Sequence, residues 1–404
     1  MDTNLYLRLP ETIESSSDSN EQLIIKPFLT DSMAGELLKK LYGMEASHTK
    51  ELPSFCDQNF HMRVTGVGGA EDGVREFVLR LSNTNDSLYQ RGCYDEIIGV
   101  LRYLQQVGSL GIYPAPVRNL QGEYLSLQTF YRGTNGKTHG VFLVMLVTFI
   151  QGGILSEVAP LSNQLLYNVG KALGRLNVTL MGYKGATSNL KARAADNRFC
   201  MTSAGNVKQY VYRESLESRR TLASTILDRF IKDVKPMEYD MQKGVIHADA
   251  NRANILISEP TNHVDAIPDI GQSKSPVISG IIDFNDMSYE CLVYDIAGSV
   301  VDMMVGRKDD QPLEGAGHFL AGFTSVVPLS TTEWNSLYVS IATRFVQLLI
   351  MSYDEYCQQI DQPDEYILRF VHAGGWDVLG ELWETPQQQV EAIWERIIQV
   401  YNNN

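Results

Sequence analysis

The segment spanning residues 244–257 constrains the fold of this 404-residue chain more than any other part of the sequence. It reads Gly-Val-Ile-His-Ala-Asp-Ala-Asn-Arg-Ala-Asn-Ile-Leu-Ile, so two short apolar runs, each typical of a buried strand, flank a polar loop. The loop holds Asp249 and Asn254, and a further apolar run ends in Asp283. A short loop between two strands can direct an acid and an amide toward one point, and a carboxylate at the end of another strand can join them. The sequence therefore predicts a polar site built from three oxygen-bearing side chains.

These residue types are the ones that phosphoryl transfer requires. A carboxylate must orient the attacking hydroxyl and accept its proton, and hard oxygen ligands must hold Mg²⁺ on the phosphates. We predict that Asp249 is the catalytic base or hydroxyl-orienting group and that Asn254 and Asp283 are metal ligands. His247 is predicted to hold the loop by hydrogen bonding. The alternative is that Asp249 and Asn254 only cap a turn between two strands, which does not explain their occurrence together with Asp283.

The chain divides into a β-rich first part and a mainly helical second part. Residues 1–24 include the polar run Glu-Ser-Ser-Ser-Asp-Ser-Asn-Glu, which has no helical or strand period and predicts a disordered tail. The break at Gln151-Gly152-Gly153 predicts a hinge, so that residues 25–151 form one lobe and residues 152–404 another. This order predicts an α+β, protein-kinase-like two-lobed fold, with a small antiparallel-sheet N-lobe and a larger, mainly helical C-lobe. Strands are expected at 60–64, 76–81, 123–130 and 141–149, and helices at 31–42, 94–106, 163–181, 214–233, 295–305, 332–359 and 386–400.

Composition narrows the partners and the compartment. The formal net charge of −14 disfavours binding to nucleic acid or to an anionic membrane. The five cysteines are scattered and include no Cys-x-x-Cys pair, which indicates a reducing compartment without a disulfide framework or zinc site. The first 21 residues contain no apolar run typical of a signal peptide. The longest apolar run, 140–150, is about half of the roughly 20 residues that span a bilayer. These features predict a cytoplasmic protein.

A kinase of this fold also needs a cation on a central strand of the N-lobe for the α- and β-phosphates, paired with a Glu on the next helix. No lysine occurs between Lys50 and Lys137, and the predicted strand offers Arg80 instead. We expect Glu96 to be the partner of this arginine, with Asp95 as the fallback. The alternative is that Arg80 is a solvated charge on one face of the strand.

The other nucleotide contacts are expected from the backbone. Thr148, Phe149 and Ile150, at the hinge, are expected to receive the base, and the loop 54–59 is expected to cover the phosphates. The Gly-Val-Gly-Gly run at 66–69 lacks the Lys and the following helix of a phosphate cradle, and it predicts a hairpin turn. Because no Gly-x-x-x-x-Gly-Lys-[Ser/Thr] motif is present, the architecture is not that of a P-loop kinase.

Four stretches carry a resemblance to a known family. They are His-x-Asp-x-Asn-x-x-Asn-Ile-Leu-Ile (247–257), Gly-Ile-Ile-Asp-Phe-x-Asp-Met-Ser-Tyr (280–289), Gly-His-x-Leu-Ala-Gly-Phe (317–323) and Asp-Gln-Asn-Phe (57–60). Together they resemble the aminoglycoside phosphotransferase and choline kinase superfamily and, within it, the hydroxylysine kinases, from about residue 28 to 398. The resemblance implies a Mg²⁺-dependent kinase that transfers the γ-phosphate of GTP or ATP to the hydroxyl of 5-hydroxy-L-lysine. Another small-molecule amino alcohol (homoserine, choline, ethanolamine) or an aminoglycoside is the alternative acceptor.

Two positions depart from the resembled pattern. Arg80 stands in place of a lysine, and a guanidinium is longer and planar. Asn285 stands in place of a glycine, although Asn tolerates left-handed backbone better than most residues. These departures raise the alternative of a weakened kinase or a nucleotide-binding pseudoenzyme. The intact set of Asp249, Asn254 and Asp283 favours an active enzyme.

The acceptor side offers three carboxylates close behind Asp283. Asp286, Glu290 and Asp295 are candidates to bind an ammonium group of the acceptor. The alternatives are that Asp286 supports the catalytic loop and that Asp295 N-caps the predicted helix 296–305, since Asp is a favoured N-cap residue.

Overall fold

The computed structural model describes residues 22–23, 26–54, 56–65, 74–108, 111–132, 138–259, 276–307, 311–358 and 365–403. The chain separates into two compact units, Met1–Ile150 and Gln151–Asn404. Most of the predicted tail and the predicted turn at 66–69 lie outside the described residues.

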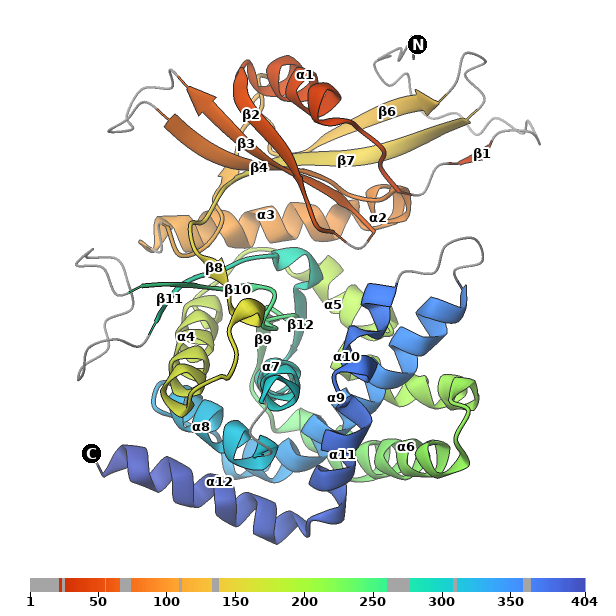
Figure 1. Cartoon of the computed structure of the whole chain (residues 1–404), viewed down its shortest axis with the longest axis vertical. Helices are drawn as coiled ribbons and strands as arrows, with labels where there is room; N and C mark the ends of the chain where they lie inside the picture. Colours follow the sequence, from red (N-terminus) through yellow and green to blue (C-terminus); the bar gives the residue numbers. More distant parts are fainter. Residues whose placement is uncertain are drawn as a thin grey trace. The chain divides into compact units, whose positions relative to one another are not determined.

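Unit 1 is built on a seven-stranded sheet of order β1-β7-β4-β3-β2, with β5 and β6 also paired to β7 (Figure 1). All of its pairings are antiparallel except that of β1, the first two described residues, which runs parallel to β7. The predicted antiparallel-sheet N-lobe is confirmed. The strands are β1 (Gln22–Leu23), β2 (Ala46–Leu52), β3 (Gln58–Thr65), β4 (Val74–Leu81), β5 (Pro116–Val117), β6 (Ser126–Arg132) and β7 (Thr138–Thr148).

Alternation along the strands gives this sheet two different faces. One face packs its apolar side chains against α1 (Asp31–Tyr42). This helix has the predicted bounds, because Thr30 accepts the Met33 N–H at its start and Gly43 ends it with a left-handed φ of 68°. The other face packs against α3 (Arg91–Gln106), which follows the short α2 (Thr84–Tyr89). Figure 1 shows α1 and α3 on opposite faces of the sheet.

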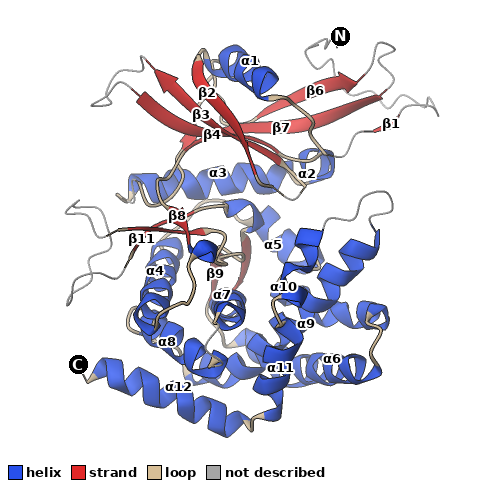
Figure 2. Ribbon diagram, in the orientation of Figure 1, coloured by secondary structure: helices blue, strands red, loops and turns tan. Residues whose placement is uncertain are grey.

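Unit 2 is mainly helical, as predicted, and holds two small sheets (Figure 2). The first consists of β8 (Gly153–Ile154), β10 (Ile255–Ser258) and β11 (Val277–Ile281), and the second of β9 (Lys243–Ile246) and β12 (Ser288–Cys291). The loop 247–254 therefore joins strands of two different sheets. The larger helices are α4 (Asn163–Met181), α5 (Ser188–Asp196), α6 (Glu217–Arg229), α7 (Leu292–Gly306), α8 (Pro312–Thr324), α9 (Thr331–Gln358), α11 (Gly375–Glu384) and α12 (Gln387–Asn402), and α10 (Arg369–His372) is a single turn.

The core of unit 2 is organised around α9. Among the described helices, α9 alone is long and apolar enough to cross a membrane by length and composition. However, 83% of its most apolar window is buried inside the protein, which is typical of a core helix. Its polar residues therefore lie in the interior, where each must find a partner.

Glycines let α4 and α8 pack with their backbones in contact. A Cβ atom on Gly170 would overlap the carbonyl oxygen of Phe319, and a Cβ on Gly322 would overlap that of Tyr167. Gly317 is similarly close to the side chain of Ile397 in α12. The Gly-His-x-Leu-Ala-Gly-Phe stretch, quoted above for its resemblance, thus serves helix packing in this fold.

Candidate active site

The catalytic loop leaves β9 at His247, and its backbone is fixed by a carboxylate from α7. Asp295 accepts hydrogen bonds from the backbone N–H of His247 (3.3 Å) and from that of Ala248 (2.8 Å). It also accepts one from the side-chain amide of Asn177 in α4 (2.9 Å). Asp295 is buried, and Ala248 has a left-handed φ of 66°. The expectation that Asp295 N-caps its helix is wrong, because α7 begins at Leu292 and includes Asp295 in its first turn.

Two amides hold the carboxylate of Asp249. The side-chain amide of Asn251 donates to Oδ1 (2.8 Å) and that of Asn254 donates to Oδ2 (2.9 Å). Burial raises the pKa of Asp249 to about 6, and the negative charge of Asp283 acts in the same direction. The positive charge of Arg344 and the hydrogen bond from Asn251 act in the opposite direction. The carboxylate is thus oriented by fixed donors and keeps lone pairs for a further donor, such as a hydroxyl.

His247 connects the loop to the strand that precedes Asp283. Its Nδ1 lies 3.3 Å from the backbone N–H of Asp249, and its Nε2 lies 3.0 Å from the carbonyl oxygen of Ile282. With Nδ1 as acceptor, the ring proton is on Nε2 and donates to that carbonyl. The N–H of Ile282 in turn donates to the carbonyl of Asn254 (2.9 Å). His247 therefore holds the loop by hydrogen bonding and makes no contact that requires it to transfer a proton.

Asp283 follows β11 and takes the left-handed conformation, with φ of 63° and ψ of 70°. The next residues, Phe284–Asp286, form a 3₁₀ turn, so the left-handed position is residue 283 and Asn285 is not strained. Arg193 in α5 holds this turn by donating to the carbonyl oxygens of Asn285 and Met287. The glycine of the resembled pattern is not needed for the turn to form.

The two predicted acceptor-binding carboxylates differ in exposure. Glu290 is buried, and it accepts hydrogen bonds from the backbone N–H of Thr202 (2.6 Å) and from the Ser288 hydroxyl (2.6 Å). Burial raises the pKa of Glu290 despite these hydrogen bonds. Asp286 is exposed, three residues after Asp283. Glu290 therefore ties β12 to the segment at Thr202, and Asp286 is the more accessible of the two.

In unit 1, Arg80 lies on β4, opposite Asn59 of β3. Its positive charge lowers the pKa of the buried Asp57, which burial itself raises. Asp57 Oδ1 also accepts from the backbone N–H (2.9 Å) and the side-chain amide (3.1 Å) of Asn83. Glu96, the expected partner of Arg80, is buried in α3. Asp57 could not be recognised from the sequence as a charge that acts on Arg80, because 23 positions separate the two residues.

The hinge residues differ in how their backbone groups are used. The N–H of Thr148 donates to the carbonyl of Ala115 (2.9 Å), and that of Phe149 donates to the carbonyl of Glu76 (3.0 Å). Ile150 is buried, and among the described residues none accepts a hydrogen bond from its N–H. Of the three residues predicted to receive the base, Ile150 is therefore the one whose N–H is not used in a hydrogen bond within the described residues.

The donor atoms at the loop suit a hard divalent cation. Asn254 uses its amide nitrogen toward Asp249, which leaves the amide oxygen for a metal, and Asp283 adds a carboxylate. Mg²⁺ prefers oxygen ligands and keeps several waters and phosphate oxygens in its shell, so few protein ligands are needed. In the described ranges, no group of three or more His, Cys, Asp and Glu side chains is arranged to hold a metal by itself. The chemistry of the donor set therefore fits Mg²⁺ bound together with a nucleotide.

An antiparallel-sheet unit followed by a helical unit, with an acid, an amide and a second acid on adjoining loops, defines a kinase-like small-molecule phosphotransferase. The model that describes the phosphotransferase enzyme family, APH, matches residues 67–329. The chain belongs to this family. It is an enzyme that transfers phosphate to an alcohol group and is similar to the hydroxylysine kinases.

Two hydroxylysine kinases align over nearly the whole chain, and a homoserine kinase aligns over a smaller part of it. Hydroxylysine kinase from Bos taurus is 29% identical over 96% of this chain and 99% of its own length. Hydroxylysine kinase from Danio rerio is 30% identical over 91% of this chain and 96% of its own length. Homoserine kinase from Methylobacillus flagellatus is 24% identical over 64% of this chain and 70% of its own length.

Solved structures show the same fold at low identity. One is an amicoumacin kinase in complex with AMP-PNP, Ca²⁺ and Ami. It aligns with 87% of this chain and 94% of its own length, with a TM-score of 0.58 and 16% sequence identity. A microcompartment-associated aminopropanol kinase covers 92% of this chain and 98% of its own, with the same TM-score and identity. These likenesses confirm the predicted kinase-like α+β fold.

Proposed function

We propose that this chain transfers the γ-phosphate of GTP to the hydroxyl of 5-hydroxy-L-lysine in a Mg²⁺-dependent reaction, with ATP as the alternative donor. The observation that carries the proposal is the carboxylate of Asp249, which the amides of Asn251 and Asn254 hold in place. The full-length similarity to hydroxylysine kinases supports the choice of acceptor. The five cysteines are all among the described residues, and none of them forms a disulfide, which supports a cytoplasmic location.

In this proposal the residues of the loop act on the acceptor hydroxyl. Asp249 orients the hydroxyl and accepts its proton as the oxygen forms a bond to the γ-phosphorus, and the bond from that phosphorus to the bridging oxygen breaks to release the nucleoside diphosphate. Asn254 and Asp283 would hold Mg²⁺, which would neutralise charge on the phosphates. In unit 1, Arg80 binds the phosphates and the backbone of Ile150 binds the base.

Homoserine is the second candidate acceptor, because a homoserine kinase aligns with two thirds of the chain. Choline, ethanolamine and aminoglycosides have weaker support, because the sequence relatives described above are hydroxylysine and homoserine kinases. A weakened, nucleotide-binding protein was an alternative because of Arg80 and Asn285. The turn geometry argues against it, since Asp283 takes the left-handed position and Asn285 is accommodated.

A coupled assay of purified protein tests the proposal. Mg·GTP and Mg·ATP are each supplied with 5-hydroxy-L-lysine, L-homoserine, choline, ethanolamine or an aminoglycoside. The expected result is the highest kcat/KM for 5-hydroxy-L-lysine, with GTP as the better donor. A higher value for any other acceptor would replace hydroxylysine, and nucleotide binding without turnover of any acceptor would contradict the activity itself.

A further inference from the structure

Arg344 is a buried cation in the middle of α9. It is 6% exposed, and it is the only charged residue of the helix between Glu333 and Asp354. Its Nη1 donates to the carbonyl of Phe199 (2.7 Å) and to the side chain of Gln347 (2.6 Å). Its Nε is buried, and no described residue accepts a hydrogen bond from it. A buried, charged N–H without an acceptor lowers the free energy of unfolding. The Nε side of this guanidinium is therefore a candidate site for a ligand that accepts its hydrogen bond.

Hydroxyl groups without partners accompany this guanidinium. Ser340 Oγ and Thr343 Oγ1 are buried on α9 and have no hydrogen-bond partner among the described residues. Residues spaced three and four apart share one face of a helix, so Ser340 shares a face with Thr343 and with Arg344. Ser299 Oγ, on the neighbouring α7, is also buried without a described partner. The two packed helices α7 and α9 therefore carry three buried hydroxyls and one guanidinium N–H, that of Nε, without a hydrogen-bond partner among the described residues.

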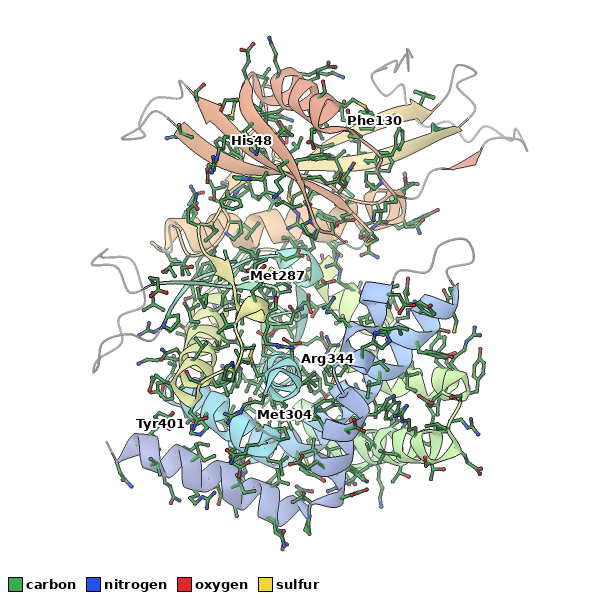
Figure 3. All side chains as sticks on the ribbon, viewed as in Figure 1. His48, Phe130, Met287, Met304, Arg344 and Tyr401 are labelled. Carbon is green, nitrogen blue, oxygen red and sulfur yellow. The ribbon has the colours of Figure 1, made fainter. Side chains whose placement is uncertain are left out.

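This polar group adjoins the catalytic loop. A Cβ atom on Gly298 of α7 would lie 3.9 Å from Arg344 Nε and 3.8 Å from the carbonyl oxygen of Ala248. The guanidinium and the loop backbone thus approach each other at a glycine, where no side chain separates them. The positive charge of Arg344 also lowers the pKa of Asp249, and does so more than that of Arg369. Figure 3 shows Arg344 beside α7.

We propose that the Nε side of Arg344 binds the carboxylate of an amino-acid acceptor, with the α7–α9 hydroxyls as additional donors. The inference rests on the proposed function and deepens it, since 5-hydroxy-L-lysine carries a carboxylate that choline, ethanolamine and aminoglycosides lack. A guanidinium can form two parallel hydrogen bonds to a carboxylate, and water exclusion strengthens them. The Nη1 contacts explain how Arg344 supports Phe199, but they leave the Nε side without a role.

Binding of paired ligands tests this inference without requiring turnover. Isothermal titration calorimetry, with Mg·GDP present, compares 5-hydroxy-L-lysine with 5-hydroxy-L-lysinamide, which has a neutral amide in place of the carboxylate. The wild type is expected to bind the carboxylate form at least about 10-fold more tightly. Arg344→Gln is expected to abolish this preference, and Arg344→Lys, which keeps the charge but not the planar fork, is expected to reduce it.

Gln347→Ala is the matched control. It removes hydrogen bonds to the carbonyls of Arg198 and Cys200 and the side-chain acceptor of Arg344 Nη1. It therefore disturbs the same segment and the Nη1 side of the guanidinium, but not the Nε side. The preference for the carboxylate is expected to persist in this variant. Its persistence in both Arg344 variants would overturn the inference, as would equal binding of the two ligands by the wild type.

Failure of the proposed function gives a different result. If homoserine is turned over in place of hydroxylysine, the same comparison with homoserine and its amide still tests Arg344. Loss of the preference in Arg344→Gln would then support the inference although hydroxylysine is not the acceptor. Preferred turnover of choline, ethanolamine or an aminoglycoside would overturn both proposals, because these acceptors offer Arg344 no carboxylate.

Discussion

The side-chain amide of Asn254 donates both to the carboxylate and to the backbone carbonyl of Asp249, at 2.9 Å in each case. The proposed metal ligand is thus also a support of the proposed base. The two residues form one unit in which each depends on the other. Their substitution should therefore not have independent effects.

Asp249→Ala and Asn254→Ala are expected to be strongly non-additive in kcat. Either change disrupts the same unit, so the double variant should be about as slow as the slower single variant. A double-mutant cycle on kcat with 5-hydroxy-L-lysine measures this. Additive losses would show that the two residues act separately.

Asp295→Asn is expected to weaken both stability and activity. The substitution turns one carboxylate oxygen into an N–H₂ group that faces the backbone N–H groups of His247 and Ala248. The free energy of unfolding should fall by about 2–3 kcal/mol, and kcat should fall because the loop is no longer fixed. Urea denaturation and steady-state kinetics measure the two effects.

Asp302→Asn, on the same helix, is the control, since Asp302 binds Arg252 outside the 247–249 segment. Equal losses of kcat in the two variants would contradict the role assigned to Asp295.

Gly322→Ala is expected to lower the free energy of unfolding by about 1–3 kcal/mol or more, because the added methyl overlaps the carbonyl of Tyr167 and forces α4 and α8 apart. Gly380→Ala is the control, since a Cβ there meets no atom within 4 Å. Because alanine favours the helix more than glycine does, Gly380→Ala should leave the free energy of unfolding unchanged or raise it slightly. Thermal unfolding of both variants measures the difference, and similar stabilities would show that the helices do not depend on the glycine contact.

Glu290 is expected to make stability depend on pH. Burial raises its pKa above the ordinary value of 4.5, so the folded protein holds this proton more firmly than the unfolded chain does. Its contribution to stability is therefore greatest below pH 4.5 and falls as the pH rises from there through the raised pKa. Glu290→Gln removes this titration. The unfolding free energy of Glu290→Gln relative to the wild type should increase with pH over that window. A difference that does not change with pH would contradict the assignment.

The parts of the fold that local sequence determines were the parts that could be predicted. The bounds of α1 follow from Thr30 and Gly43, which cap it, and the strands on either side of the catalytic loop follow from their apolar runs. The helix α8 was missed because it contains three glycines, which lower helix propensity. Packing against α4 requires those small residues, and this requirement is not visible in the sequence of α8 alone.

The residues that hold the catalytic loop in place were the least predictable part of the site. Asn177, Asp295 and Arg344 come from three helices that the sequence separates widely, and tertiary packing alone brings them to the loop. The one local signal was Arg344, the only charge of α9 between Glu333 and Asp354, since an arginine is rarely buried unless it is paired. The start of α7 was also misplaced, because Cys291 provides no side-chain cap to mark it.

The most direct test of the account is the turnover of 5-hydroxy-L-lysine by Asp249→Asn with Mg·GTP, with nucleotide affinity measured on the same protein. We predict that kcat falls by about 10³-fold or more while the Kd for Mg·GTP stays within about threefold of the wild-type value. A variant that retains wild-type kcat would contradict the central role of Asp249.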